Sequence, residues 1–139
     1  MKTSREKYGM LLCPIRETKA FLEKDLGKPK GTIFAIDQSP GNPSKSYWLQ
    51  FLNQDTPVLF GAEKFAKEYN IPVVFCTINK VKRGHYQGIL KLIEEFPNQT
   101  KYGDITTRNT KALEKDILKN PEFWLWTHKR WKHKRTITN

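Results

Sequence analysis

Cysteine is scarce in this chain, and its placement suits neither a disulfide framework nor a zinc site. The two cysteines, Cys13 and Cys76, each lie inside an apolar run, MLLCPI and VVFCTI, as is typical of small buried side chains. His128 and His133 show no zinc-ligand spacing with them. The sequence therefore predicts two buried free thiols, a reducing compartment, and neither a metal ion nor any other cofactor.

Long hydrophobic runs are also missing. The longest, such as IPVVFCTI, are far shorter than the roughly 20 residues that a membrane-spanning helix needs. The opening MKTSREKYG is polar and lacks the apolar centre of a secretion signal. We therefore expect that the chain as given neither spans a membrane nor is secreted.

Acidic residues are few relative to basic ones. The chain has 25 Lys and Arg against 14 Asp and Glu, which gives a formal charge of +11. Such a balance predicts a polyanionic partner, whether nucleic acid, anionic lipid or an acidic protein. The length of 139 residues and the 37% hydrophobic content allow one modest core, so we expect a single domain, or part of one, over residues 1–139.

The hydrophobic pattern predicts an α/β fold, a mixed sheet flanked by helices. We expect a hairpin around Arg83-Gly84 and a helix that starts at Asp55-Thr56-Pro57. The predicted strands are residues 9–15, 32–37, 47–53, 71–83 and 85–96. The predicted helices are residues 16–27, 55–69 and 106–120, with a last short helix after Pro121.

Asp37 is the best single candidate for a site carboxylate. It follows the apolar run TIFAI and precedes Gln38 and the irregular loop SPGNPSKS. Site residues favour such a position at the end of a strand. An Asx-type turn cap on the same loop is the equally weighted structural alternative.

The segment PEFWLWTHKRWKHKR, residues 121–135, combines aromatic and basic residues. Trp124, Trp126 and Trp131 cannot all lie on one helical face, so at least one should contact something outside the core. The alternative is that the aromatic residues belong to the core and the basic ones form a solvated face. The combination favours a phosphate-bearing, partly apolar partner.

Local motifs for catalysis or nucleotide binding are not visible. Lys45-Ser46 lacks the preceding glycine of a phosphate-binding loop. No sequence-local pairing of His with Asp, or of Cys with His, supplies a base beside a nucleophile. We therefore interpret His128 and His133 as polar surface or interface groups.

The segment PEFWLWTHKRWK resembles the C-terminal signature of the bacterial lipid A biosynthesis (late) acyltransferases, members of the lysophospholipid acyltransferase superfamily. SREKYG resembles the family's Arg-containing block, and IFAIDQSPGN its block with an acidic residue and a proline turn. The stretch TPVLFGAEKFAKEYNIPVVFCTINKVKRGHY is similar to the family's helix, strand and basic turn. The resemblance covers nearly the whole chain but only about the C-terminal half of a family member.

The family's His-x-x-x-x-Asp/Glu motif has no match here, since none of His85, His128 and His133 is followed by an acid five residues later. The resemblance implies that such a histidine takes a proton from a hydroxyl of a lipid A precursor, which then attacks the thioester of an acyl carrier protein. No catalytic residue is therefore assigned in this chain, and we expect it to be inactive alone.

The resemblance also implies a set of binding residues. Arg5 would pair with a phosphate of the lipid head group, and Asp37 or Gln38 would bond polar groups of the sugar. The other implied substrate-binding residues are Arg83, His128, Arg130 and Trp131. Phosphates or an acidic membrane surface would be contacted by Lys129, Lys132, Lys134 and Arg135.

By the same resemblance, the protein would lie at the cytoplasmic face of the bacterial inner membrane, either peripherally or through an anchor in a missing N-terminal segment. A sheet divided in this way should expose an apolar edge and dimerise or aggregate. Two alternatives remain. One is a nucleic-acid-binding module whose tryptophans stack on bases, and the other is a catalytically empty relative that binds lipid.

Overall fold

The structure is a computed structural model that describes residues 5–24 and 27–135. The chain divides into two compact units, unit 1 with residues 1–33 and unit 2 with residues 34–139. The prediction of a single domain stays a prediction.

The described part of unit 1 includes a short helix. The 3-10 turn η1, Ile15–Glu17, leads into α2, Thr18–Glu23, so the predicted helix exists but is shorter than expected. Lys30 Nζ closes its C-terminal end by donating to the carbonyl oxygens of Leu22 (2.5 Å) and Lys24 (2.7 Å). The prediction of a strand over residues 9–15 is wrong, because the apolar side chains there have no neighbouring strand and stay largely exposed.

Unit 2 begins its regular structure with a hairpin of β1, Tyr47–Phe51, and β2, Gln54–Val58. The turn residues Leu52 (φ 49°) and Asn53 (φ 61°) are both left-handed, as in the tight turn that suits two twisted antiparallel strands. β1 confirms the predicted strand. The predicted helix start at Asp55-Thr56-Pro57 is wrong: these residues lie in β2, because proline fits an edge strand as well as a first helical turn.

The helix predicted to follow is present but starts later, as α3, Gly61–Tyr69. The second hairpin, β3 (Val73–Lys82) and β4 (His85–Glu94), turns at Arg83-Gly84 and confirms the prediction. Among the described residues, its two strands pair only with each other.

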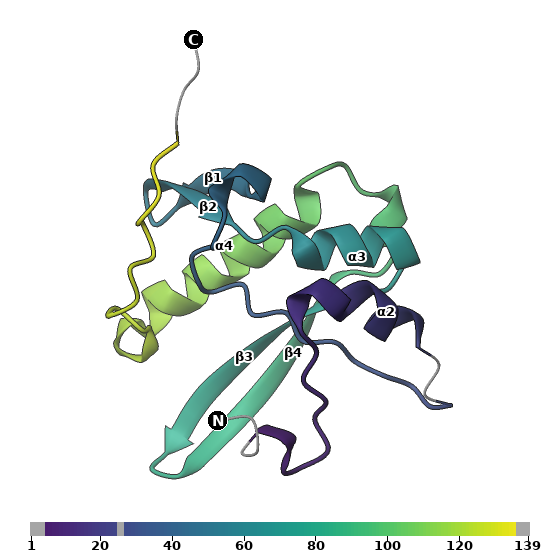
Figure 1. Ribbon diagram of the computed structural model, residues 1–139. Coiled ribbons are helices and arrows are strands. Elements are labelled where there is room, and N and C mark those ends of the chain that lie inside the picture. The colour runs from purple at the N-terminus through teal and green to yellow at the C-terminus, as the bar shows by residue number, and fades with distance from the viewer. Residues whose placement is uncertain (1–4, 25–26, 136–139) are drawn as a thin grey trace. The chain divides into compact units, whose positions relative to one another are not determined.

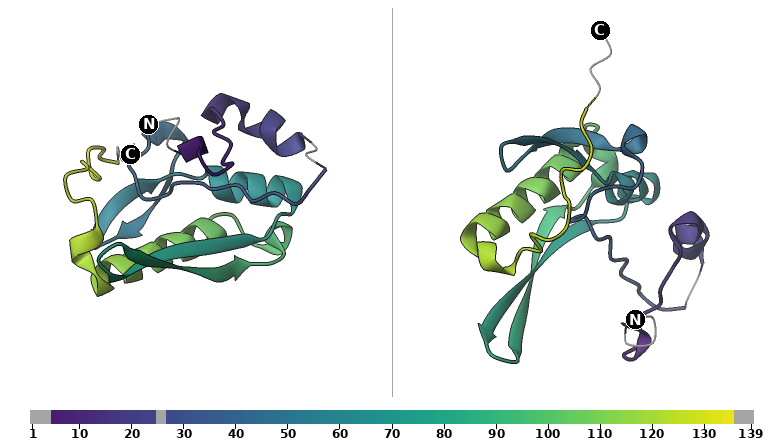
Figure 2. Two further views of the ribbon diagram at one scale, coloured as in Figure 1. Left: turned by 90° about the horizontal axis from the view of Figure 1, so that it is seen from below. Right: turned by 60° about the vertical axis from the view of Figure 1, so that its left-hand side comes forward.

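The long helix α4, Asp104–Lys119, confirms the predicted helix over residues 106–120. It lies between the two hairpins in all three ribbon views (Figure 1, Figure 2). Its Asp116 Oδ2 accepts a hydrogen bond of 2.5 Å from Thr77 Oγ1 in β3. Its Arg108 donates to the carbonyl oxygen of Ile93 and pairs with Glu94 of β4, both at 2.6 Å. α4 thus holds one face of the β3–β4 hairpin.

Single turns of 3-10 helix complete unit 2. They are η2 (Pro43–Lys45), η3 (Pro97–Gln99) and η4 (Pro121–Phe123). η4 replaces the last helix predicted after Pro121. Residues 125–135 run past the outer side of the β1–β2 hairpin (Figure 1, yellow).

The α/β class is confirmed, and its strands form two separate antiparallel sheets within the described residues, where we expected one mixed sheet. Residues 32–36 run without strand pairing, so the strand predicted over residues 32–37 is wrong. Cys76 is exposed and Cys13 is half-buried, which corrects the prediction of two buried thiols. The described helices include none that is long and apolar enough to cross a membrane.

A buried carboxylate joins α3 to the start of α4. Glu63 in α3 is 1% exposed, and it accepts hydrogen bonds from the backbone N–H of Gly103 (2.6 Å) and of Thr106 (2.7 Å). These are donors that a helix start leaves without intrahelical partners. The negative charge also lies at the positive end of the helix dipole.

Replacing Glu63 with Gln should therefore destabilise unit 2 by about 3 kcal/mol, because the amide accepts less strongly and turns an NH₂ group toward N–H donors. Urea unfolding measures the loss, and the amides of Gly103 and Thr106 should exchange hydrogen faster. The exposed Glu122→Gln serves as the control. Equal stabilities of the two variants would contradict this role for Glu63.

A second carboxylate, Glu114 in α4, holds the β1–β2 turn. Its Oε1 accepts from Leu52 N at 2.5 Å, and its Oε2 pairs with Lys111 at 2.7 Å. The hydrogen bond from Lys111, with the further one from the Leu52 N–H, keeps the pKa of Glu114 below its ordinary 4.5, although burial opposes the shift.

Glu114→Gln should cost about 1 kcal/mol of stability near neutral pH. A lowered carboxyl pKa stabilises the fold above the ordinary value and loses that contribution as pH falls through the folded value. The difference between wild type and variant should therefore shrink as pH drops below 4.5. Thermal unfolding across this range tests the prediction, and a gap that stays constant with pH would rule it out.

Candidate recognition site

The loop after Asp37 contacts the C-terminal segment in unit 2. Asp37 itself is half-buried, Gln38 is exposed and Pro40 is buried. Within the described part of this loop, the side-chain cap comes from Asn42, whose Oδ1 accepts from Ser44 N (3.0 Å) and Ser44 Oγ (2.7 Å). Asn42 thus occupies the capping role that we had weighed for Asp37.

In the C-terminal segment, residues 124–135, inward and outward side chains alternate irregularly. Arg130 is buried, and the residues half-buried beside it are Trp124, His128, Trp131 and His133. The exposed cations are Lys129, Lys132, Lys134 and Arg135. The alternation places polar and aromatic anchors against the protein and directs positive charge outward.

Two histidines tie this segment to the loop. Ser39 N donates to His128 Nε2 at 2.9 Å, and His133 Nε2 lies 2.9 Å from the carbonyl oxygen of Pro40. Since a carbonyl only accepts, His133 donates through Nε2, whereas His128 accepts through Nε2. The two rings hold successive parts of the loop, and they fit our interpretation of both as interface groups.

Arg130 lies under the same contact. Its Nη1 donates to the carbonyl oxygen of Pro57 at 2.9 Å, and its guanidinium carbon lies 5.5 Å from the centre of the Phe51 ring. Burial lowers the pKa of Arg130, and the charge of Asp37 opposes that shift. The charges of Asp37 and Arg130 thus lie near enough to attract each other.

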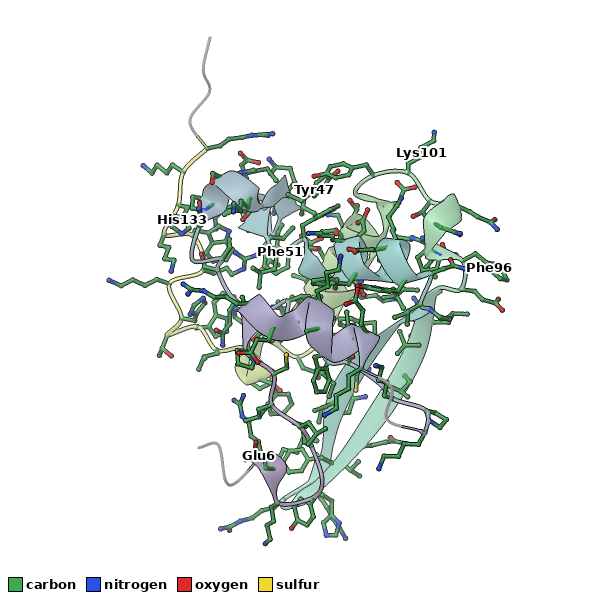
Figure 3. All side chains as sticks on the ribbon, turned by 45° about the vertical axis from the view of Figure 1, so that its right-hand side comes forward. Glu6, Tyr47, Phe51, Phe96, Lys101 and His133 are labelled. Carbon is green, nitrogen blue, oxygen red and sulfur yellow. The ribbon has the colours of Figure 1, made fainter. Side chains whose placement is uncertain are left out.

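Aromatic packing fixes the segment on the β1–β2 hairpin. Trp124 and Trp131 have ring centres 6.2 and 6.3 Å from that of the fully buried Phe51, and Trp131 Nε1 donates to Thr56 Oγ1 at 2.8 Å. Trp126 remains 56% exposed, in keeping with the expectation that the three rings do not share one buried face. Figure 3 labels Phe51 and His133 on this side of unit 2.

The outermost described part of the segment also contacts the hairpin. Arg135 Nη1 lies 3.9 Å from Asp55 Oδ1, with both side chains more than a third exposed, and its guanidinium carbon lies 5.7 Å from the Trp48 ring centre. Such an exposed pair contributes little stability, so Arg135 is available for a ligand at small cost.

The structure brings together Asp37, Gln38 and the segment with His128, Arg130 and Trp131. It does not bring Arg83 to them, because that residue is exposed in the turn at the far end of the β3–β4 hairpin (Figure 1). Arg5 is exposed in unit 1, and its predicted role beside the head group stays a prediction.

Several members of this contact escaped sequence reasoning. His133 was interpreted only as a generic interface group, and Thr56 and Phe51 were assigned only to a helix start and a strand. No sequence signal marked His133, because its partner is the backbone carbonyl of Pro40, 93 residues away. The pairing of Thr56 with Trp131, 75 residues away, has no local signal.

The arrangement is chemically suited to binding a ligand. Most of the inward groups hydrogen-bond to unit 2, although Trp124 Nε1 and Arg130 Nε have no partner among the described residues. Gln38 and the outward lysines are exposed to a ligand. In the part of the chain that the structure describes, no three His, Cys, Asp or Glu side chains gather as a metal site would require. The exposed groups suit phosphate and polar sugar groups.

Replacing Arg130 with Ala should destabilise unit 2 by about 3 kcal/mol, because the change leaves the Pro57 carbonyl without its donor and Asp37 without its nearby charge. Arg135→Ala, in the same segment, should cost about 0.5 kcal/mol at most. Urea unfolding of both variants decides the matter. A cost for Arg130→Ala as small as that of Arg135→Ala would show that the buried guanidinium is dispensable.

Comparison with known proteins gives one result. Residues 1–133 match the family model described as bacterial lipid A biosynthesis acyltransferase. Searches of curated proteins and of solved structures found no significant match. Since the match covers nearly the whole chain, including both the Asp37 loop and most of the C-terminal segment, the chain belongs to the bacterial lipid A biosynthesis acyltransferase family.

Proposed function

We propose that this chain recognises the phosphorylated lipid A precursor for an acyltransferase that takes its fatty acyl chain from acyl carrier protein. The observation that carries the proposal is the joining of the Asp37 loop to the basic C-terminal segment through His128 and His133. The family assignment supports lipid A acyl transfer as the reaction.

Phosphate groups of the precursor would bind the outward cations of the segment. Lys129, Lys132 and Lys134 are exposed, while the residues between them anchor the backbone. Anchoring reduces the conformational freedom that binding would otherwise remove. Arg135 would add a planar, two-pronged donor for a phosphate.

Polar groups of the sugar would bind at the loop. Asp37 is half-buried with its charge near Arg130, and a carboxylate so placed accepts hydrogen bonds from sugar hydroxyls. The exposed Gln38 offers both a donor and an acceptor. His128, Arg130 and Trp131 would act by positioning the loop, and Arg5 would complete the proposed substrate-binding set. Arg83 is left out of this set, because it lies in the β3–β4 turn.

The chain alone should not transfer acyl groups. The family's His-x-x-x-x-Asp/Glu pair, which would supply the general base, has no match in this sequence. The binding groups would then serve an acyl transfer whose general base does not come from this sequence. The reaction would take place at the cytoplasmic face of the bacterial inner membrane. A relative that binds lipid without catalysis remains the alternative within the same family.

A nucleic-acid-binding module fits the structure less well. That alternative needs several tryptophans free to stack on bases. Trp124 and Trp131 pack on Phe51, which leaves Trp126 as the one exposed tryptophan of the segment. A single exposed ring among lysines favours a lipid head group over a run of stacked bases.

The combined change of Lys129, Lys132 and Lys134 to Gln should weaken binding of phosphorylated lipid A precursor in detergent micelles about tenfold, since exposed charge pairs contribute modestly. Lys101, Lys115 and Lys119 changed to Gln provide a control with the same loss of charge at other exposed positions. Fluorescence titration gives the Kd. Equal weakening by both triple variants, or no preference for the phosphorylated form, would contradict head-group recognition.

Catalysis is tested separately, with an acyl carrier protein thioester and the same precursor. We expect no turnover by the chain alone. Turnover that falls in an Asp37→Asn variant would contradict the proposed inactivity while leaving the recognition site intact. Tight binding of single-stranded RNA with a steep salt dependence, without binding of the precursor, would instead favour the nucleic-acid alternative.

A further inference from the structure

The β3–β4 hairpin has a charge pattern that the proposed function does not use. From Val73 to Ile93 the chain contains no Asp or Glu, whereas it contains the four cations Lys80, Lys82, Arg83 and Lys91. Every residue from 80 to 92 is exposed. The exposed end of the hairpin therefore carries positive charge without a compensating acid of its own.

One face of this hairpin is apolar and open. Val74, Cys76 and Ile78 alternate outward along β3, and the strand register places Leu92, Leu90 and Gly88 directly opposite them. The exposed fractions are 52% for Val74, 68% for Ile78, 70% for Leu90 and 55% for Leu92. Side chains this large form a continuous apolar surface across both strands.

The opposite face is partly covered by α4. Thr77, half-buried between two outward residues of β3, bonds to Asp116 of α4, and Arg108 bonds to the end of β4. The left view of Figure 2 shows the hairpin lying along α4. The hairpin thus contacts α4 on one face and exposes the apolar surface on the other.

The turn combines both kinds of group. Val81 and Tyr86, each 66% exposed, lie among Lys80, Lys82 and Arg83. Tyrosine with neighbouring cations is the composition found at the boundary between water and lipid, where the ring is partly buried and the charges meet phosphates.

We propose that the β3–β4 hairpin is a membrane-docking element, which places its outward apolar face and its basic turn into the head-group region of an anionic bilayer. An anionic bilayer would remove the apolar side chains from water and would also supply negative charge to the cations of the turn. This goes beyond the proposed function, since vesicle binding requires neither the acyl donor nor its acceptor.

Other partners would match the hairpin's apolar face and its cations less completely. A nucleic acid would neutralise the cations but leave Ile78 and Leu90 in water, apart from any base that stacks there. A second copy would cover the apolar face but bring another hairpin with four cations and no acid against the first. Anionic lipid would both cover the apolar face and neutralise the cations.

The test uses the 139-residue chain with vesicles of phosphatidylglycerol and phosphatidylcholine in equal parts, and with vesicles of phosphatidylcholine alone. Lys80, Lys82 and Arg83 changed together to Gln should weaken binding to the anionic vesicles about a hundredfold. Ile78→Ser combined with Leu90→Ser should weaken it at least tenfold. Because all five positions are exposed, these changes should leave the fold intact, which circular dichroism checks.

Matched controls separate docking from general attraction of a positively charged chain. The Gln variant of Lys101, Lys115 and Lys119 removes the same charge elsewhere, and Leu118→Ser removes a leucine that is 70% exposed, as Leu90 is. Neither should change binding by more than about threefold, as removal of surface charge away from the bilayer has a screened, small effect. Hairpin and control variants that weaken binding equally would overturn the proposal.

Cys76 provides a direct reading from the centre of the apolar face. With Cys13 changed to Ser, a polarity-sensitive fluorophore on Cys76 should shift to shorter wavelength with anionic vesicles and be quenched by lipids brominated near the head group. An unshifted label on bound protein would overturn the proposal, as would loss of vesicle binding only in the Lys129, Lys132 and Lys134 variant. A vesicle-free dimer that Leu90→Ser dissociates would assign the face to a second copy instead.

Discussion

The arrangement of unit 2 depends on how the C-terminal segment is held against the β1–β2 hairpin. Arg130 is buried with a hydrogen bond to the Pro57 carbonyl and a ring contact with Phe51. Trp131 bonds to Thr56 on the same strand. The turns at residues 126–131 place these two side chains against unit 2 and leave Lys129 and Lys132 exposed on either side of them. The direction of the exposed lysines is thus a consequence of two inward anchors.

Elements with strong local signals could be predicted from the sequence. The β3–β4 hairpin follows from two strand patterns around Arg83-Gly84, and α4 follows from its apolar spacing and the Asn120-Pro121 end. Predictions failed where the outcome depends on distant partners. Residues 9–15 and 32–36 have strand-like composition but no neighbouring strand to pair with, and Asp55-Thr56-Pro57 fits a strand or a helix start equally well locally. Cys76 was expected to be buried because it lies in an apolar run. The prediction failed because such a run does not reveal whether both faces of its strand are covered.

The site was predictable in a different way. Local pattern singled out Asp37 as the end of an apolar run and residues 121–135 as an aromatic and basic segment, but nothing local connects the two. Their joint role came from resemblance to a family, and the structure supplies the contacts in the form of His128, His133 and Arg130. His133 was passed over as a site residue because its partner is a backbone carbonyl, which leaves no trace in sequence. Arg83 lies in the turn of the β3–β4 hairpin, away from this site. Its positive charge resembles that of the C-terminal segment, but a shared charge gives no information on the distance between the two.

The contacts between the loop and the segment join residues far apart in the chain. Ser39 and His128 are separated by 89 positions, and Pro40 and His133 by 93. Contacts of such separation carry a large loop-closure cost and form late in folding. During synthesis the loop leaves the ribosome long before the segment that holds it. The exposed lysines therefore acquire their fixed geometry only after the residues up to His133 have been synthesised, so a product that stops before His133 would lack an ordered basic surface.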